Sequence, residues 1–202
     1  FLGAGKTTLI LKAAQVLSAR GLRVAAILND QDAGLVDTRF AGAQSVQAEE
    51  VAGGCFCCRF SDLVDAAERL RVHNPDVIFA EPVGSCTDLL ATVVRPLLAN
   101  HRNEFELAPL TILLDSNRSL AGYDAAVGYL YQKQLAEAEI VGLTKMDLLA
   151  PQEAKAREEK FKKFYSPLPV LSLSTQNDAS IQHWLDQVLA QTSQATRTLE
   201  ID

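Results

Sequence analysis

Three of the four cysteines in this 202-residue chain lie within residues 55–58, as Cys55, Cys57 and Cys58. Thiolates this close together are ligands that Zn²⁺ and other late transition metals prefer. Two alternatives stay open, namely a redox pair of Cys55 and Cys58, and burial of the three side chains in a core. The redox alternative lacks a thioredoxin-like context. The spacing therefore favours a metal site that leaves one position for a fourth ligand or a recipient protein.

A phosphate-binding motif opens the chain. Gly5, Lys6 and Thr7 supply the end of the pattern G-x-x-x-x-G-K-[ST], whose first glycine would precede Phe1. A helix that follows at once would aim its backbone N–H groups and its positive end at a phosphate. Lys6 would reach the β- and γ-phosphates, and Thr7 would place its hydroxyl on Mg²⁺. A chance glycine-rich helix start is the alternative.

The segment "GLTKMD", residues 142–147, predicts that the base is guanine. It matches [NT]-K-x-D, in which Asp147 would accept hydrogen bonds from the N1–H and amino groups of guanine. Adenine lacks this donor pair, so an unpaired carboxylate would penalise ATP. Lys145 would lie along the base plane. Thr144 stands where Asn is usual and lacks an amide donor, which would weaken guanine affinity. A solvated turn is the alternative.

Two other strand ends carry acidic residues. Glu81 ends the apolar segment of "VIFAEPVG", where P-loop proteins place an acid that holds Mg²⁺ through water, and Gly84 would offer its N–H to the γ-phosphate. Loss of that phosphate would release the loop. Residues 29–37 form either a second phosphate-sensing loop or an ordinary solvated loop, with the carboxylates Asp30, Asp32 and Asp37. Asp115 also ends a strand, where capping of the next turn explains it.

The fourth cysteine, Cys86, lies two residues after Gly84. We hypothesise that Cys86 completes a four-sulfur site in one nucleotide state only, which would couple hydrolysis to metal release. The histidines are scattered along the chain and are interpreted as surface or partial-core residues rather than ligands; they are His73, His101 and His183.

The bulk composition is that of an ordinary globular domain, with 48% apolar and 22% charged residues. The formal net charge is −6 and the basic residues are scattered, which argues against nucleic acid as a partner. There is no apolar run of about 20 residues, the length that spans a bilayer, and no signal-peptide pattern. We therefore expect a cytoplasmic protein with neither a membrane nor a nucleic-acid partner.

The elements that must position these residues alternate along the chain. Apolar runs predict strands over 22–28, 76–80, 110–115 and 169–174 and within 139–147, while helical periodicity predicts helices over 7–21, 61–73, 86–100, 124–138, 151–165 and 178–191. Ser61 is the predicted N-cap of its helix, and Pro96 a predicted kink. The alternation predicts an α/β fold, in which a mostly parallel central sheet is flanked by helices on both faces. Ligands bind such folds beyond the carboxyl ends of the strands.

The P-loop, the segment "GGCFCC", a strand ending in E-P-x-G and a [NT]-K-x-D loop, in this order, resemble the CobW family. Its members are metal-handling GTPases with a three-layer P-loop NTPase fold, related to the nickel-insertion GTPases of urease and hydrogenase maturation. The resemblance covers nearly all of the chain. It implies that the nucleotide and Mg²⁺ are bound by Gly3, Ala4, Gly5, Lys6, Thr7, Thr8, Lys145 and Asp147, and the transferred metal by Cys55, Cys57 and Cys58.

The chain departs from the family pattern in two ways. The loop that often reads N-E-x-x-E in the family has a shorter acid at Asp30 and no carboxylate at Ala33, so we expect no metal site that uses the second acid. Family members usually carry a further C-terminal domain, often with a His-rich stretch, which residues 1–202 lack. We expect one GTPase domain over 1–202, whose first strand and first P-loop glycine precede residue 1. It is either a fragment or a divergent short member.

The sequence thus predicts a GTP-hydrolysing metallochaperone that carries Zn²⁺ or Co²⁺ to a client protein, with Lys6 and Glu81 as its catalytic residues. GTP with Mg²⁺ would assemble the thiolate site, and hydrolysis to GDP would loosen it. No arginine finger is evident, so slow intrinsic turnover is expected, and a client or a homodimer partner would supply the missing group. The alternatives are a P-loop kinase or ATPase with a structural zinc, and a non-catalytic nucleotide-gated metal sensor.

Overall fold

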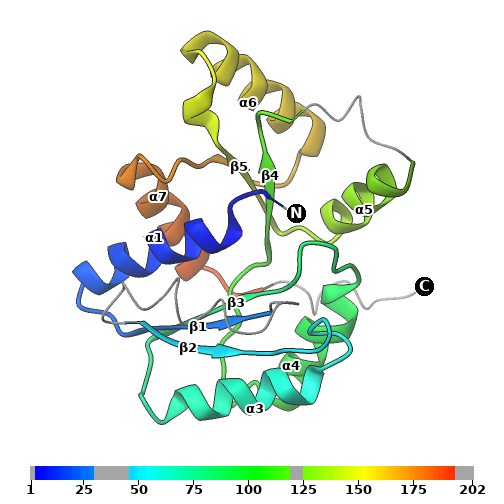
Figure 1. The fold of residues 1–202 in the computed structure, drawn as a ribbon. Coiled ribbons are helices and arrows are strands. Elements are labelled where there is room, and N and C mark those ends of the chain that lie inside the picture. Colours follow the sequence, from blue (N-terminus) through cyan, green and yellow to red (C-terminus); the bar gives the residue numbers. More distant parts are fainter. Residues whose placement is uncertain (1–2, 30–45, 119–124, 194–202) are drawn as a thin grey trace. The chain divides into compact units, whose positions relative to one another are not determined.

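The computed structural model describes residues 3–29, 46–118 and 125–193 (Figure 1). The chain divides into two compact units. The N-terminal unit is Lys6–Cys86, and the C-terminal unit comprises Gly3–Gly5 and the chain from Thr87 onward. Each unit contains a three-stranded sheet in which all described strands are parallel.

The sheet of the N-terminal unit has the order β2-β1-β3, with β1 over Val24–Leu28, β2 over Val46–Glu50 and β3 over Val77–Glu81. Helix α1 (Lys6–Ala19) covers one face and helix α3 (Phe60–Arg71) covers the other (Figure 1). All five residues of the central strand β1 are buried. The register pairs Leu28 with both Glu50 and Glu81, so the three strands end level with one another at their carboxyl edge.

The apolar periodicity of α1 explains its placement, because one stripe of its side chains is buried against the sheet. The buried residues of α1 are Leu9, Ile10, Ala13, Ala14, Val16 and Leu17. The predicted N-cap of α3 was wrong. The cap residue is Arg59, and Ser61 lies inside the helix. The N–H groups of Cys58 and Arg59 both donate to the carbonyl of Cys55, so the cysteine turn leads directly into α3.

The sheet of the C-terminal unit has the order β4-β5-β6, with β4 over Thr111–Asp115, β5 over Ile140–Thr144 and β6 over Val170–Ser172. One face packs into an apolar cluster with helices α5 (Ala125–Ala136) and α6 (Pro151–Tyr165). Side chains alternate between faces along a strand, and Thr111 on the other face accepts a 3.2 Å hydrogen bond from the indole of Trp184. Trp184 belongs to helix α7 (Asp178–Leu189), which therefore covers that face.

The predicted helix over 86–100 is interrupted near Pro96. A π-helical turn over Leu90–Val94 precedes helix α4 (Arg95–Asn100), which has Pro96 in its first turn. Proline has no backbone N–H to donate to the carbonyl four residues earlier, so a widened turn at this point has a direct physical cause. The carboxylate of Glu137 accepts the N–H of Leu90 and holds the start of this segment.

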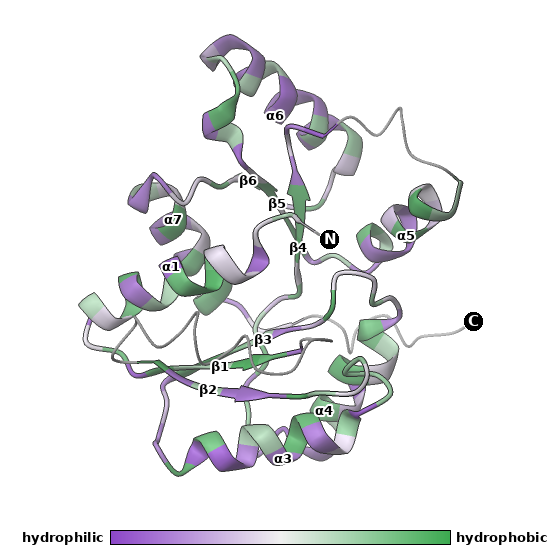
Figure 2. Ribbon diagram, in the orientation of Figure 1, coloured by the Kyte–Doolittle hydropathy of each residue, from purple (hydrophilic) through white to green (hydrophobic). Residues whose placement is uncertain are grey.

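The predicted α/β fold is confirmed, with parallel strands and flanking helices. The described strands form two hydrogen-bonded sheets of three strands each. Strand β2, with the sequence "VQAEE", was not predicted. Figure 2 shows hydrophilic residues along most of α6, the helix that the sequence predicted over 151–165. Within the described residues, no helix is long and apolar enough to cross a membrane.

Candidate functional site

The glycine-rich loop has the backbone that its sequence predicts. Gly3 and Gly5 have φ angles of +72° and +82°, in the left-handed region that other residues rarely adopt. A Cβ atom added at Gly3 would also lie 2.9 Å from Nη2 of Arg118. The left-handed conformation therefore favours glycine at position 3, whereas the guanidinium, at the end of a flexible side chain, could move aside. Helix α1 begins at Lys6, immediately after this loop.

Two residues at the start of α1 contact the acid that ends β3. The Thr7 hydroxyl donates a 3.0 Å hydrogen bond to Oε1 of Glu81, and Nζ of Lys6 lies 3.7 Å from the same oxygen. The side chains of Lys6 and Glu81 are only 19% and 12% exposed, so water screens this ion pair weakly. A hydroxyl and a carboxylate side by side fit the preference of Mg²⁺ for oxygen ligands. Thr8 is exposed in the same helical turn.

Thr144 connects the predicted base loop to the glycine-rich loop. Its hydroxyl lies 2.8 Å from the carbonyl oxygen of Ala4 and 3.1 Å from that of Leu114, and both oxygens accept its hydrogen bond. Thr144 and Ala4 are both buried. A threonine thus makes a contact to the phosphate loop at the position where the sequence pattern usually has asparagine.

The predicted base loop that follows is joined to Asp115 by one ion pair. Lys145 has a left-handed backbone with φ of +60°, which is unusual for a residue with a side chain. Its Nζ lies 2.7 Å from Oδ2 of Asp115, and Nε of Arg118 lies 3.4 Å from the same oxygen. Asp115 also accepts the N–H of Asn117, as its predicted turn-capping role requires. Asp147 is exposed in a 3₁₀ turn (Met146–Leu148).

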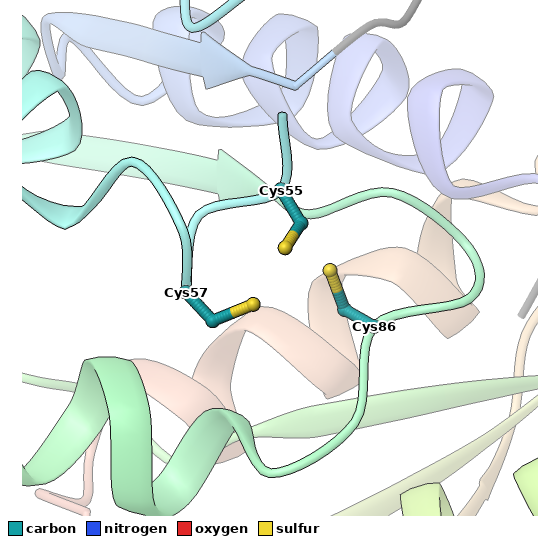
Figure 3. A group of neighbouring side chains, drawn as sticks. All are labelled: Cys55, Cys57 and Cys86. Atoms are coloured by element: carbon teal, nitrogen blue, oxygen red, sulfur yellow. The ribbon is translucent and has the colours of Figure 1, made fainter. Parts of the chain in front are cut away.

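The cysteine cluster includes Cys86 as well as the turn. The sulfur atoms of Cys55, Cys57 and Cys86 all lie within 4.8 Å of one another, and Figure 3 shows them pointing together. Cys58 also belongs to the neighbourhood, with its sulfur 3.3 Å from that of Cys55 and 3.9 Å from that of Cys57. Four zinc–sulfur bonds of about 2.3 Å in a tetrahedron require sulfur atoms about 3.8 Å apart. The two separations that involve Cys58 lie on either side of this value, and those among Cys55, Cys57 and Cys86 are at most 4.8 Å.

The thiols of the cluster differ in acidity. The hydrogen bond from Cys57 lowers the pKa of Cys55 to about 7, and the same contact raises the pKa of Cys57 to about 11. Burial raises the pKa of Cys86 to about 12, and the nearby Cys55 and Cys57 add to this effect. Cys55 is therefore the thiol of the three that ionises most readily.

Asn29 fixes the cysteine turn to the sheet. Its side-chain amide donates to the carbonyl oxygens of Val51 and Gly54, over 2.7 and 2.6 Å, and its backbone N–H donates to the carbonyl of Glu81. Asn29 is buried, and its Oδ1 is without a hydrogen-bond partner among the described residues. The sequence analysis did not predict that Asn29 anchors the cysteine turn. The one feature that could have indicated it is the position of an amide side chain directly after a buried strand.

The remaining predicted residues are less informative. Asp30, Asp32 and Asp37 lie outside the described residues. His101 pairs with Glu104 over 2.8 Å, while His73 and His183 are exposed on the surfaces of their units. The structure thus brings Cys86 to Cys55 and Cys57, and Glu81 to Lys6 and Thr7. Both groups lie in the N-terminal unit.

The glycine-rich loop, the helix that starts at Lys6 and the parallel strands define a P-loop nucleotide-binding protein of the α/β class. The chain belongs to the CobW/HypB/UreG family, whose nucleotide-binding domain matches residues 1–172.

A curated relative is a zinc chaperone CobW from a Sinorhizobium species, which is 26% identical over 205 aligned positions. The alignment covers 85% of this chain but 56% of that relative, so the chain spans about half the length of the protein it matches. Two solved structures share the fold. HypB from Helicobacter pylori in complex with nickel has a TM-score of 0.64 at 18% identity, over 94% of this chain and 82% of that one. The hydrogenase maturation factor HypB from Archaeoglobus fulgidus has a TM-score of 0.58 at 15% identity, over 94% and 85%.

Proposed function

We propose that this chain is the GTPase domain of a metallochaperone, which binds GTP, holds a transition metal at its cysteine cluster and passes the metal to a client protein. One observation carries the proposal. Residues 81–86 have at one end Glu81, in contact with Lys6 and Thr7, and at the other end Cys86, in contact range of Cys55 and Cys57. A short loop therefore connects predicted phosphate-binding residues to a thiol cluster.

The proposed roles follow from the chemistry of each side chain. Lys6 neutralises the β- and γ-phosphates, with Gly3, Ala4, Gly5 and Thr8 in the phosphate loop. Thr7 and, through water, Glu81 hold Mg²⁺, which would neutralise developing charge on the phosphates. The guanine-binding residues in this proposal are Lys145 and Asp147.

The cargo in this proposal is Zn²⁺ or Co²⁺, bound by Cys55 and Cys57 together with further thiolates of the cluster. The zinc chaperone relative supports Zn²⁺, and the soft sulfur donors suit both ions. The proposed site of action is the cytoplasm, with GTP, GDP and a metal-receiving client as partners. A client or a second copy of the chain would accelerate turnover by adding a group to the site.

The test of this function compares phosphate release from GTP and from ATP by the purified protein, with and without Zn²⁺. We expect slow hydrolysis of GTP, and at least a hundredfold excess of ATP should not displace a fluorescent GTP analogue. Preference for ATP would instead favour a P-loop kinase or ATPase with a structural zinc. Tight GTP binding without phosphate release, even with metal and client present, would favour a metal sensor.

A further inference from the structure

The four cysteines differ in their access to solvent. Cys55 and Cys57 have sulfur atoms close both to that of Cys86 and to that of Cys58. Cys86 is buried and Cys58 is exposed. Two three-sulfur groups therefore share one pair of thiols, and they differ in whether the third thiol is buried or exposed.

The two parts of the cluster are held by different anchors. The turn with Cys55 is fixed by Asn29, whose amide donates to the carbonyls of Val51 and Gly54. Cys86 lies outside that turn. It ends a loop that begins at Glu81, which contacts Lys6 and Thr7, and its own N–H donates to the carbonyl of Val83 within the loop.

Binding of a nucleotide at the phosphate loop would therefore affect the position of Cys86 more than that of the turn with Cys55 and Cys57. Lys6 and Thr7 contact Glu81, and in the proposed function the γ-phosphate and its Mg²⁺ bind to these same three residues and fix Glu81 in place. Loss of the γ-phosphate would remove this restraint on Glu81, and Cys86 lies five residues further along the same short loop. The turn of Cys55 and Cys57 keeps its anchor on the strands through Asn29.

We propose that Cys86 is the nucleotide-responsive ligand of the cargo metal and that Cys58 is its exit ligand. This inference rests on the proposed function. With GTP bound, Cys55, Cys57 and Cys86 hold the ion on the buried side, and Cys58 completes four sulfur ligands. After the γ-phosphate leaves, the loop of Cys86 withdraws and the ion stays on Cys55, Cys57 and the exposed Cys58.

The exchange is balanced without a redox step. The bond between the metal and the sulfur of Cys86 breaks, and the thiolate of Cys86 takes a proton from water. A thiol of the receiving protein loses its proton to water, and the resulting thiolate forms the replacement bond to the metal. The metal keeps its charge throughout.

The experiment uses Co²⁺, whose thiolate charge-transfer absorption reports the number of sulfur ligands. Wild type, Cys86→Ser and Cys58→Ser are titrated with Co²⁺ in the presence of a non-hydrolysable GTP analogue or GDP. For wild type we expect at least about tenfold tighter binding with the GTP analogue, at the lower end of the range for site coupling, and stronger absorption. Cys86→Ser should bind equally in both nucleotide states, with the weaker absorption of the GDP state. Cys58→Ser should keep the nucleotide response, but should transfer Co²⁺ to a chromophoric chelator more slowly.

A second measurement needs no variant. In zinc-loaded wild type, alkylation of Cys86 should be at least about tenfold slower with the GTP analogue than with GDP, because a metal-bound thiolate is protected. A nucleotide response that survives in Cys86→Ser, or equal alkylation of Cys86 in both states, would overturn this inference and leave the proposed function standing. Wild type that binds no Co²⁺ through thiolates would overturn both.

Discussion

The hydroxyl of Thr7 and Oε1 of Glu81 are 3.0 Å apart and joined by a hydrogen bond. Thr7 lies in the first turn of α1 and Glu81 is the last residue of β3, so 74 positions in sequence separate the two. The contact unites the two oxygen donors that we propose as Mg²⁺ ligands. It also gives the loop toward Cys86 a fixed starting point beside the proposed phosphate site.

Glu81→Gln tests the charge at this position. The amide keeps an oxygen that can accept from Thr7, but it cannot pair with Lys6 as an ion or hold Mg²⁺ strongly. We expect GTP hydrolysis to fall about a hundredfold, the scale of losing one preorganised electrostatic contact. The Mg²⁺ enhancement of nucleotide affinity should shrink as well. Glu159→Gln, on the exposed surface of α6, is the matched control. Equal Mg²⁺ dependence in both variants would argue against the role of Glu81.

Asp147→Asn tests the choice of base. The carboxylate of Asp147 has two oxygens that can accept the N1–H and the amino group of guanine, whereas asparagine keeps one acceptor and replaces the other by an NH₂ donor. This donor suits xanthine, which has a carbonyl in place of the amino group. We expect affinity for GTP to fall at least about a hundredfold, since unpaired polar groups discriminate strongly, and affinity for xanthosine triphosphate to rise. Asp65→Asn, exposed on α3, controls for the loss of one negative charge. Unchanged GTP affinity would place the base elsewhere.

Alkylation of the metal-free protein tests the contact between Cys55 and Cys57. The thiolate is the reactive form, and the pKa of Cys55 is lowered to about 7 whereas that of Cys57 is raised to about 11. The rate at Cys55 should therefore rise as pH increases through 7 and then level off, while Cys57 stays slow. Iodoacetamide labelling from pH 6 to 8, read by tandem mass spectrometry, measures both rates. In Cys57→Ser the Cys55 profile should move to higher pH. Parallel profiles for the two cysteines would contradict the assignment.

Gly142→Ala tests the packing of the strand before the base loop. A Cβ atom there would lie 2.7 Å from side-chain atoms of Leu113 and Leu173. Overpacking of this kind costs about 1–3 kcal/mol of unfolding free energy. Gly128→Ala, in helix α5, would meet no atom within 4 Å and should stabilise by about 0.5–1 kcal/mol. Urea unfolding of both variants measures the difference, and equal midpoints would refute the close packing at position 142.

The alternation of strands and helices could be predicted because apolar runs and helical periodicity are local signals. Strand β2 was not predicted because its sequence "VQAEE" has two acids and little apolar pattern, and among the described strands β1 is its only partner. Ser61 was misassigned because α3 begins one residue earlier, at Phe60, and its N-cap residue Arg59 makes no side-chain cap hydrogen bond. The pairing of β2 with β1 joins segments that are distant in sequence, so no local pattern indicates it.

The same limit applies to the candidate site. The spacing of Cys55, Cys57 and Cys58 predicted a thiolate site directly, since the three are neighbours in sequence. Cys86 could be raised only as a hypothesis, because its approach depends on the path of the loop after β3. The roles of Asn29 and of the Thr144 contact to Ala4 need positions far apart in sequence, and the structure alone brings these together.

The central claim is that the bound nucleotide controls metal binding at the cysteine cluster. Its most direct test is the Zn²⁺ affinity of the protein, measured by competition with a chromophoric chelator in the presence of a non-hydrolysable GTP analogue or of GDP. Site coupling typically changes affinity about five- to 150-fold, and we predict tighter Zn²⁺ binding with the GTP analogue by a factor in this range. Equal Zn²⁺ affinity in the two nucleotide states would contradict the claim.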